Sequence, residues 1–428
     1  MNEKNHSRIE EFRQIRKEIR GSSDYLIVGI DVAKDKHHAF LGTATGRTLL
    51  RRLIFENSMN GFEKLLEYAE TIKARHALEK AVFGLEPTSN YHKPLAEYLI
   101  KCGYNVVLVS GVAVVRNREL LDGRWDKNDD KDSANIADLI SQGKCQYYDH
   151  ASKEVRGIRS LLSLKRRLKK QEHGTKVRIR NHLLAQYFPE FDKYFGKGCS
   201  ESLAIVKWCL KPSKIWNMEF GEFVHLVAPR VRTLGQKKRL RDIWDVAIES
   251  VGCEAGEELD FEARLMIEDL EQIRESIKKV DEHIEEMCMG FPEYKHLRSI
   301  PGFGPDVSSN VIAAIGDPFR FENSSQVLKL AGFDLSAARS GNTSDKAVPV
   351  ISKKGKAFLR YALYQAAFIA STKNKHFMVY YTNKLKGRER EKGIRTKMIV
   401  KLAAKMLIIA WTLMKKREPF DYGHLNLN

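Results

Sequence analysis

Four acidic residues in the first third of the chain are spaced in a way that suits a metal site. Asp31 directly follows the apolar run Tyr25–Ile30, and Glu86 follows the apolar run of residues 80–85. A buried carboxylate is costly unless it is paired, hydrogen-bonded or metal-bound. Taken alone, Asp31 fits a strand end that caps the next turn equally well. If the two strands are neighbours in one sheet, the two carboxylates can share one site.

Two more carboxylates, Asp129 and Asp132, lie at the expected start of a helix. Their spacing of three puts them on one face of its first turn. Asp is also common in first turns because it caps free amides and opposes the helix dipole, and we interpret Asp126 and Asp130 in that way. Together with the two strand-end carboxylates, the set offers only hard oxygen ligands. Such a set suits Mg²⁺, with Mn²⁺ as an alternative, and not zinc.

A carboxylate site of this kind indicates phosphoryl transfer. Two ions about 3.5 to 4 Å apart can stabilise both the attacking and the leaving oxygen of a phosphodiester. The elements that must position the carboxylates are those of a mixed α/β domain over residues 24–150. Thr43–Gly46 supplies a turn, so the first three strands are expected to form an antiparallel meander. The expected strands lie near residues 25–31, 38–42, 48–55, 80–85 and 104–110, with helices at 61–74, 91–102 and from 130 onward.

The composition favours a polyanionic partner. The chain of 428 residues carries 73 Lys and Arg against 55 Asp and Glu, a net charge of +18, which is typical of nucleic-acid-binding proteins. The six cysteines are scattered without a CxxC pair, so we expect reduced thiols in the cytoplasm and neither a zinc knuckle nor a disulfide framework. The charged first 20 residues contain no signal peptide, and Lys401 and Lys405 interrupt the most apolar late segment, so no membrane span is expected.

The middle of the chain, residues 151–290, begins with a basic amphipathic helix. Residues 151–180 hold eleven Lys or Arg and two acidic residues. A one-signed face is often only a solvated surface, but this density favours phosphate contact, with DNA and structured RNA both open. A small helical insertion follows, with a second basic cluster at Lys237–Arg239. The expected nucleic-acid contacts on the basic helix are Arg166, Arg167, Lys170, Arg178 and Arg180.

A heptad pattern closes this middle region. Apolar residues from Met266 to Met287 recur at alternating spacings of four and three, which predicts a coiled coil and hence a homo-oligomer, a dimer or tetramer. The alternative is a long helix that packs on its own domain, because three heptads are near the minimum for a coiled coil.

The last domain, residues 291–428, is expected to be mainly helical. Gly302 and Gly304 lie between two short helices, as in helix-hairpin-helix elements whose backbone amides approach a phosphate. A tight interhelical turn explains the same pattern equally well. Farther along, Lys353, Lys354 and Arg360 form a basic element that can contact nucleic acid.

These motifs occur in a familiar order. Asp31 in Gly-Ile-Asp-Val-Ala-Lys, Glu86 in Gly-Leu-Glu-Pro-Thr, and Asp129 and Asp132 in Lys-Asn-Asp-x-x-Asp-Ser-Ala resemble the RNase H/RuvC-like DEDD domain of insertion-sequence family one-ten. The basic Lys-x-Gly-x-x-x-Leu-Arg element and Ser340-Gly341 resemble the C-terminal transposase domain of the same family, now described as bridge-RNA-guided recombinases.

The resemblance implies roles that the residues alone do not. It gives Ser340 the role of a nucleophile that joins covalently to DNA, although serines 336, 344 and 352 are equally plausible hydroxyls and a loop Ser before Gly is most often a turn residue. It also implies donor and target DNA and a structured guide RNA as partners. We therefore expect a site-specific recombinase of a mobile element. The rival hypotheses are a RuvC-like endonuclease that uses metal-activated water, and a catalytically inert nucleic-acid-binding assembly factor.

Overall fold

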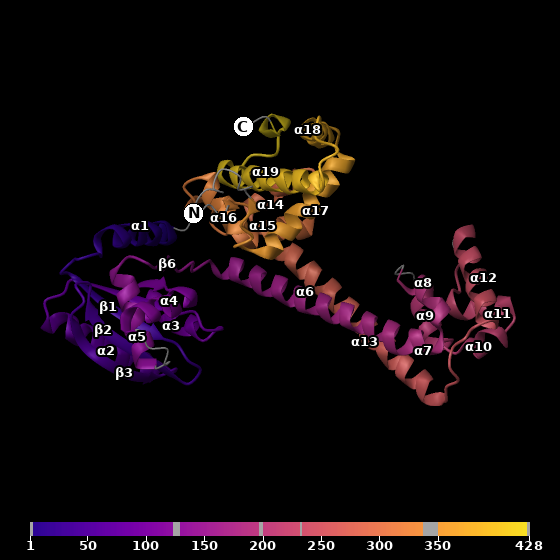
Figure 1. The fold of residues 1–428 in the computed structure, drawn as a ribbon, viewed down its shortest axis with the longest axis horizontal. Coiled ribbons are helices and arrows are strands. Elements are labelled where there is room, and N and C mark those ends of the chain that lie inside the picture. The colour runs from indigo at the N-terminus through magenta and orange to yellow at the C-terminus, as the bar shows by residue number, and fades with distance from the viewer. Residues whose placement is uncertain (1–2, 123–128, 197–199, 232, 337–349, 426–428) are drawn as a thin grey trace. The chain divides into compact units, whose positions relative to one another are not determined.

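The structure of the chain is a computed structural model. The described residues are 3–122, 129–196, 200–231, 233–336 and 350–425. The chain divides into two units, residues 1–151 and 152–428, and each is described by itself. Figure 1 shows the first unit in indigo to purple and the second in magenta to yellow.

The first unit contains a mixed sheet flanked by helices. Its strands are β1 (Tyr25–Asp31), β2 (Lys36–Thr43), β3 (Thr48–Glu56), β4 (Lys80–Leu85), β5 (Asn105–Leu108) and β6 (Gln146–Tyr147). Its helices are α1 (Glu3–Glu18), α2 (Met59–Arg75), α3 (His92–Lys101), α4 (Gly111–Asp122) and α5 (Asp129–Ser141). The strand order is β3-β2-β1-β4-β5-β6.

The strand pairing confirms the predicted mixed α/β domain. β1, β2 and β3 form the expected antiparallel meander. β1 also pairs in parallel with β4, and β4 with β5. Every residue of β1 from Tyr25 to Ile30 is buried, as is typical of a central strand that is covered on both faces.

The two faces of the sheet have separate cores. Leu26, Val28 and Ile30 of β1 pack with residues of α2 and α3. Because successive side chains of a strand alternate between faces, Tyr25 and Ile27 point the other way, into a core that α5 completes. The side of the sheet that carries Tyr25 and Ile27 is the one on which residues 29 and 31 also lie.

Helix α5 lies directly on this second face because the strands carry glycine there. A Cβ atom at Gly29 would be 2.2 Å from the carbonyl oxygen of Ser133, and one at Gly84 would be 2.0 Å from Cδ1 of Ile140. Any larger residue would force the helix away from the sheet. The two glycines therefore allow the backbone of α5 to contact β1 at Gly29, two residues before Asp31.

The second unit is mostly helical, which confirms the coarse prediction for the rest of the chain. It begins with α6 (Lys153–Arg178), which continues as the π-helix η1 (Ile179–Leu184). The insertion contains α7 (Ala185–Tyr187), η2 (Pro189–Phe191), α8 (Asp192–Phe195), α9 (Ser200–Trp208), α10 (Pro212–Trp216), α11 (Phe220–Val227) and α12 (Leu234–Ile248). After the long helix α13 (Glu257–Met289) come α14 (Pro292–Arg298), α15 (Pro305–Ile315), η3 (Pro318–Arg320), α16 (Ser324–Ala331), β7 (Leu335–Ser336), β8 (Val350–Ile351), α17 (Ala357–Lys373), α18 (Lys375–Leu385), α19 (Ile394–Lys416) and η5 (Tyr422–Leu425).

Helices α6 and α13 form an antiparallel pair (Figure 1). Three contacts define the register. Lys165 Nζ lies 2.7 Å from Asp281 Oδ1. Arg274 Nε donates to Glu172 Oε1 at 3.2 Å, and Thr175 Oγ1 donates to Asp269 Oδ2 at 3.2 Å. Leu270, Ile277 and Ile284 of the heptad pattern are buried within this single chain. In this structure α13 therefore packs on α6 of its own chain, and a coiled coil between chains stays a prediction.

The helix pair connects two hydrophobic cores. Near one end, Ile158 and Leu162 of α6 and Ile284 of α13 belong to the core of helices α14 to α19. Near the other end, Ile179 of η1 and Leu270 of α13 belong to the core of the insertion. Between the two cores, the three polar contacts that define the register accompany Ile277 of α13, which is buried.

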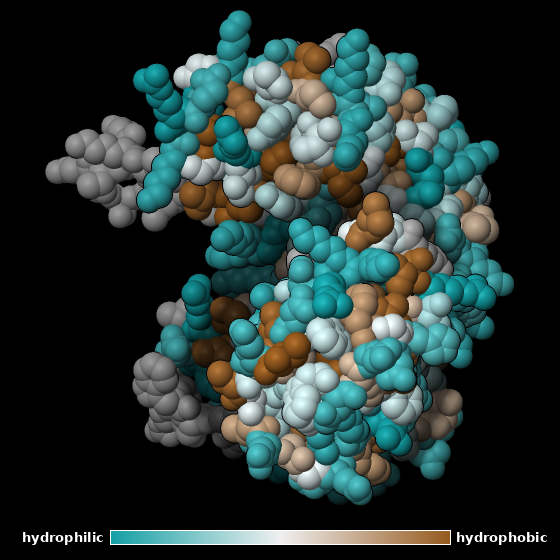
Figure 2. Space-filling view, turned by 90° about the vertical axis from the view of Figure 1, so that its right-hand side faces the viewer, coloured by the Kyte–Doolittle hydropathy of each residue, from teal (hydrophilic) through white to brown (hydrophobic). Residues whose placement is uncertain are grey.

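Hydrophilic residues dominate the face of the molecule in Figure 2, with apolar residues interspersed among them. Within the described part of the chain, no helix combines the length and the apolar character needed to cross a membrane. α19, the most apolar late segment, is a packed helix whose inner side is buried from Ile394 to Met414.

Candidate active site

The parallel pairing of β1 and β4 brings Asp31 and Glu86 to one edge of the sheet. Ile30 lies opposite Leu85 in the register, and the backbone N–H of Glu86 donates to the carbonyl oxygen of Ile30 at 3.4 Å. Adjacent strands are about 4.8 Å apart, so the two carboxylate-bearing residues are neighbours. Both are half-buried. The two strands are thus neighbours in one sheet, which is the condition given above for a site that Asp31 and Glu86 share.

Both carboxylates belong to the face that α5 covers. Side chains alternate along a strand, so Asp31 follows Gly29 on that face and Glu86 follows Gly84. On the other side of β1, His38 of β2 is the cross-strand partner of Asp31, close enough for their side chains to interact. His38 belongs to no motif in the sequence, and its only signal there is its place in the strand next to that of Asp31.

The start of α4 lies against the carboxylate of Glu86. A Cβ atom at Gly111, the first residue of α4, would lie 2.6 Å from Glu86 Oε1. Only a glycine leaves this carboxylate where it is. The positive end of the helix dipole also favours a negative group at this point. α4 therefore contributes to the geometry and to the electrostatics of the site.

Asp132 forms a buried ion pair with Arg118 of α4. Its carboxylate oxygen Oδ1 accepts from Nη2 of Arg118, and the side chains of Asp132 and Arg118 are 4% and 17% exposed. Asp132 directly precedes Ser133, whose carbonyl contacts the position of Gly29. Arg118 could not be identified from the sequence, because nothing there shows that residues 111–122 form a helix beside α5.

Further hydrogen bonds tie α4 to α5 next to this ion pair. Nδ2 of the buried Asn117 donates to Asn135 Oδ1 at 2.6 Å and to Asp138 Oδ2 at 2.8 Å. Nδ2 of Asn135 donates to the carbonyl oxygen of Val114 at 2.7 Å. A buried polar network of this kind is rigid when its groups are satisfied. The two helices thus act as one support for the carboxylates.

The donor set fits a hard cation only in part. Asp31 and Glu86 offer adjacent carboxylates at one edge, as Mg²⁺ or Mn²⁺ requires. The backbone of Asp129 begins α5, but its side chain lies outside the described residues. Among the described residues, no three His, Cys, Asp or Glu side chains come together as metal ligands. In this structure the carboxylate of Asp132 is already paired with the guanidinium of Arg118.

The residues expected to act in the last domain have separate surroundings. Ser340 lies outside the described residues, in the segment that connects β7 to β8. Lys353 and Lys354 are exposed just after β8. Nη1 of Arg360 donates to the carbonyl oxygens of Ala331 at 2.8 Å and Gly355 at 3.3 Å, so its guanidinium holds the loop that carries the two lysines.

The two glycines of the expected phosphate-binding turn differ. Gly302 has φ +88°, and a Cβ atom there would lie 2.4 Å from the carbonyl oxygen of Ala366 in α17. Gly304 precedes α15, and its nearest neighbour would be Arg298 Nη1 at 3.7 Å. Gly302 thus serves packing between helices, whereas Gly304 stands at an open helix N-terminus.

The five basic residues predicted to contact nucleic acid, four on α6 and Arg180 on η1, are distributed over three sites. Arg166 stacks on the ring of Phe358, 4.6 Å from its centroid. Nε and Nη2 of Arg180 donate to the two carboxylate oxygens of Asp192, each at 2.6 Å. The remaining three, Arg167, Lys170 and Arg178, line one groove of about 610 Å³ between α6 and α13.

The fold and the site define a two-unit protein, with a carboxylate pair at the edge of a mixed sheet and a basic helical second unit. Comparisons with known proteins identify its relatives. A family model described as a transposase matches residues 28–189, and one described as the transposase IS116/IS110/IS902 family matches residues 294–382. The chain belongs to this transposase family and is a DNA recombinase enzyme.

Individual relatives agree with this membership. The IS110 insertion element protein of Streptomyces coelicolor is 22% identical over 402 residues, which covers 91% of this chain and 94% of the relative. The IS116 insertion element protein of Streptomyces clavuligerus is 23% identical over 93% of this chain and 96% of its own. A pilin gene-inverting protein of Moraxella bovis is 28% identical over 153 residues, 34% of this chain and 46% of the relative.

Proposed function

We propose that this protein is the recombinase of an insertion sequence that cleaves and exchanges DNA strands with Mg²⁺ and a serine nucleophile. The observation that carries the proposal is the parallel register of β1 and β4, which puts Asp31 beside Glu86. Paired carboxylates at one sheet edge suit phosphodiester chemistry. The sheet is, on this proposal, of the RNase H/RuvC-like kind.

Asp31, Glu86, Asp129 and Asp132 would hold Mg²⁺ or Mn²⁺, which supplies charge stabilisation at the scissile phosphate. Arg118 compensates the charge of Asp132 while that carboxylate is buried. Gly111 keeps the carboxylate of Glu86 at the start of α4. The chain thus positions Glu86 and Asp132, two of the four carboxylates, by contacts of its own.

Ser340 is the proposed nucleophile. Its Oγ forms a bond to the scissile phosphorus and the serine proton passes to solvent. The bond from phosphorus to the leaving DNA oxygen breaks, and that oxygen takes up a proton from solvent to become a hydroxyl. A DNA hydroxyl then attacks the phosphoserine and releases the serine, so the phosphodiester is restored without an energy source. A serine hydroxyl is weak without an activating environment, and Lys353 and Lys354, exposed in the following loop, are suited to neutralise phosphate charge.

A structured guide RNA that pairs with donor and target DNA would provide sequence specificity, as the resemblance to bridge-RNA-guided recombinases implies. The protein then reads shape and backbone, as RNA-guided nucleases do. The groove with Arg167, Lys170 and Arg178 supports contact with a polyanion. We further propose a homo-oligomer, a dimer or tetramer, that acts in the cytoplasm.

The test is an incubation of the protein with its element RNA, Mg²⁺ and labelled junction DNA, analysed on denaturing gels. Wild type is compared with Ser340→Ala and Asp31→Ala. The matched controls are Ser344→Ala, in the same segment, and Asp24→Ala, an exposed carboxylate just before β1. We expect a DNA-linked protein band in wild type and both controls, and none in the two site variants.

Two other results would assign a different function. Cleavage that survives Ser340→Ala without a linked band would indicate a nuclease that uses metal-activated water. Nucleic-acid binding that is equal with and without Mg²⁺, without any cleavage, would indicate an assembly factor with a degenerate site.

A further inference from the structure

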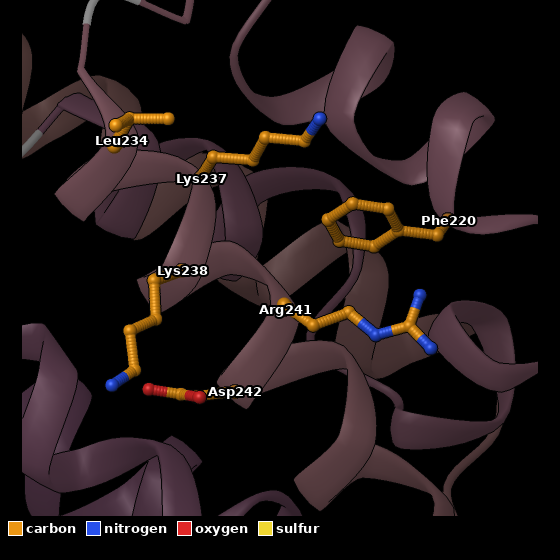
Figure 3. Close-up of a pocket in the computed structure, with 6 residues that line it drawn as sticks. All are labelled: Phe220, Leu234, Lys237, Lys238, Arg241 and Asp242. Carbon is orange, nitrogen blue, oxygen red and sulfur yellow. The ribbon is translucent and has the colours of Figure 1, made fainter.

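The insertion carries an open groove that the proposed chemistry does not use. It has a volume of about 660 Å³ and lies between the start of α11 and the first half of α12. Figure 3 shows its side chains, with the ring of Phe220 between Lys237 and Arg241. The lining residues are Phe220, Leu234, Lys237, Lys238, Arg241 and Asp242.

The groove is strongly cationic. Lys237, Lys238 and Arg241 are all exposed, and Asp242 is the acidic member of the set. Lys237 and Arg241 are four residues apart on α12 and so project from the same face of the helix. Closely spaced exposed cations that converge on a groove are suited to the phosphates of a nucleic-acid backbone.

Arg241 is held in place by aromatic rings. Its guanidinium carbon lies 4.9 Å from the ring centroid of Phe220 and 4.7 Å from that of Trp244. Its Nε is 3.2 Å from Asp245 Oδ1, one turn farther along the helix. A guanidinium that is fixed on two rings and one carboxylate loses little freedom when its remaining donors bind a phosphate.

Apolar surface adjoins the cations. Leu234, the first residue of α12, is 89% exposed, and Phe220 is half-buried at the first position of α11. Bases stack on such surfaces only when they are unpaired, because a duplex keeps its base faces inside. The combination of cations with apolar faces therefore favours a single strand over a duplex.

We propose that this groove binds unpaired nucleotides of a polynucleotide strand, with Lys237, Lys238 and Arg241 on the phosphates and Phe220 against a base. The inference rests on the proposed function in one respect, that the protein works on nucleic acid. It adds a binding site on the insertion, made of residues other than the four carboxylates and the serine.

The experiment measures binding of the full chain to short labelled oligonucleotides by fluorescence anisotropy at several salt concentrations. The probes are a 12-nucleotide oligouridylate RNA, the corresponding oligothymidylate DNA, and a DNA duplex. The test variant is Lys237→Glu/Lys238→Glu. Its matched control is Lys278→Glu/Lys279→Glu, two adjacent lysines on α13 that are 69% and 71% exposed.

We expect the test variant to bind single strands at least tenfold more weakly than wild type. The slope of log affinity against log salt should fall by about 1.4, since each phosphate contact on a single strand contributes roughly 0.7. Phe220→Leu should weaken binding severalfold without changing this slope, because stacking releases no counterions. The RNA and DNA probes then show which kind of strand the groove prefers.

Equal affinities of the test and control variants would overturn the proposal, as would a loss of duplex affinity in the test variant as large as its loss of single-strand affinity. Thermal melting of each variant checks that it is folded. Because the probes contain no element ends and require no cleavage, this result is independent of the test for strand transfer. A protein that binds the single strands but forms no covalent link would retain the groove and lose the serine mechanism.

Discussion

At the level of single residues, the candidate site depends on the missing side chain at Gly111 of α4 as much as on the side chain of Arg118. The first residue of α4 is a glycine, and the Glu86 carboxylate occupies the space where a side chain would begin. A methyl group at this position would meet the far end of a flexible side chain, which can rotate away. The fold can therefore tolerate the change while the carboxylate cannot keep its place.

Gly111→Ala should accordingly separate activity from stability. We expect strand cleavage to slow by up to about 10²-fold, since a displacement of about 1 Å in a catalytic group can have that effect, with little change in melting temperature. The control is Gly196→Ala at the end of α8, where a Cβ atom meets nothing within 4 Å. Equal cleavage by both variants would show that Glu86 does not need its present position.

Arg118 has the opposite role, because it supplies a charge that a buried group needs. Arg118→Met leaves Asp132 buried without its cation, and breaking a buried pair in this way costs about 3 kcal/mol of unfolding free energy. The double variant Arg118→Met/Asp132→Asn should recover part of that loss. Lys278→Met, which breaks the exposed pair with Glu282, should cost less than about 0.5 kcal/mol. Urea unfolding measures all three.

At the level of elements, the turn between α14 and α15 contains two glycines, Gly302 and Gly304, whose replacement should have different costs. Gly302→Ala introduces a side chain at φ +88° and within 2.4 Å of the Ala366 carbonyl oxygen, so we expect a loss of about 2 kcal/mol or more. Gly304→Ala meets no atom closer than 3.7 Å and should cost less than about 1 kcal/mol. Chemical denaturation distinguishes the two. Similar losses would contradict the packing role given to Gly302.

The α6–α13 pair contains a buried carboxylate that makes stability depend on pH. Burial alone would raise the pKa of Glu172, but hydrogen bonds from Lys176, Arg274 and Lys169 outweigh it and lower the pKa to about 2. The unfolded chain takes up this proton near its ordinary value of 4.5. The stabilisation is therefore complete above about pH 5 and is lost as the pH falls from there toward 2.

Glu172→Gln should thus lower the unfolding free energy by up to about 3 kcal/mol at pH 7, and the difference from wild type should shrink by about 2 kcal/mol at pH 3. Urea titrations at the two pH values provide the measurement. Glu282→Gln, at a carboxylate that is 65% exposed, serves as the control and should behave like wild type. A pH-independent difference would mean that the Glu172 carboxylate is not ionised against its neighbours.

At the level of the whole molecule, local patterns predict the elements but not their partners. Alternation and turn residues are enough for the β1–β2–β3 meander. The site depends on the parallel pairing of β1 with β4, which joins strands about fifty residues apart. From the sequence, this pairing could only be stated as a condition for a shared carboxylate site. The apolar heptad positions of α13 can pack equally well on a helix of the same chain or of another chain. Their spacing alone therefore cannot distinguish the two kinds of partner.

The same limit applies to side-chain roles. Arg180 and Arg360 were expected on nucleic acid because of their charge, yet one pairs with Asp192 and the other donates to backbone carbonyls. Charge in the sequence does not reveal whether a neighbour already uses it. Arg118 and His38 gave no local signal, since their relation to Asp132 and Asp31 comes from helix packing and strand pairing.

The hydrogen bond between Thr175 and Asp269 has a consequence for how such a chain can change. Residues 176–268 leave the helix pair and return to it at one point, because these two side chains lie 3.2 Å apart. A segment whose ends meet can be lengthened, exchanged or cut out in favour of a short turn without pulling the rest of the chain apart. The insertion and its groove can thus be replaced or lost while the sheet unit and the core of helices α14 to α19 keep their own sequences.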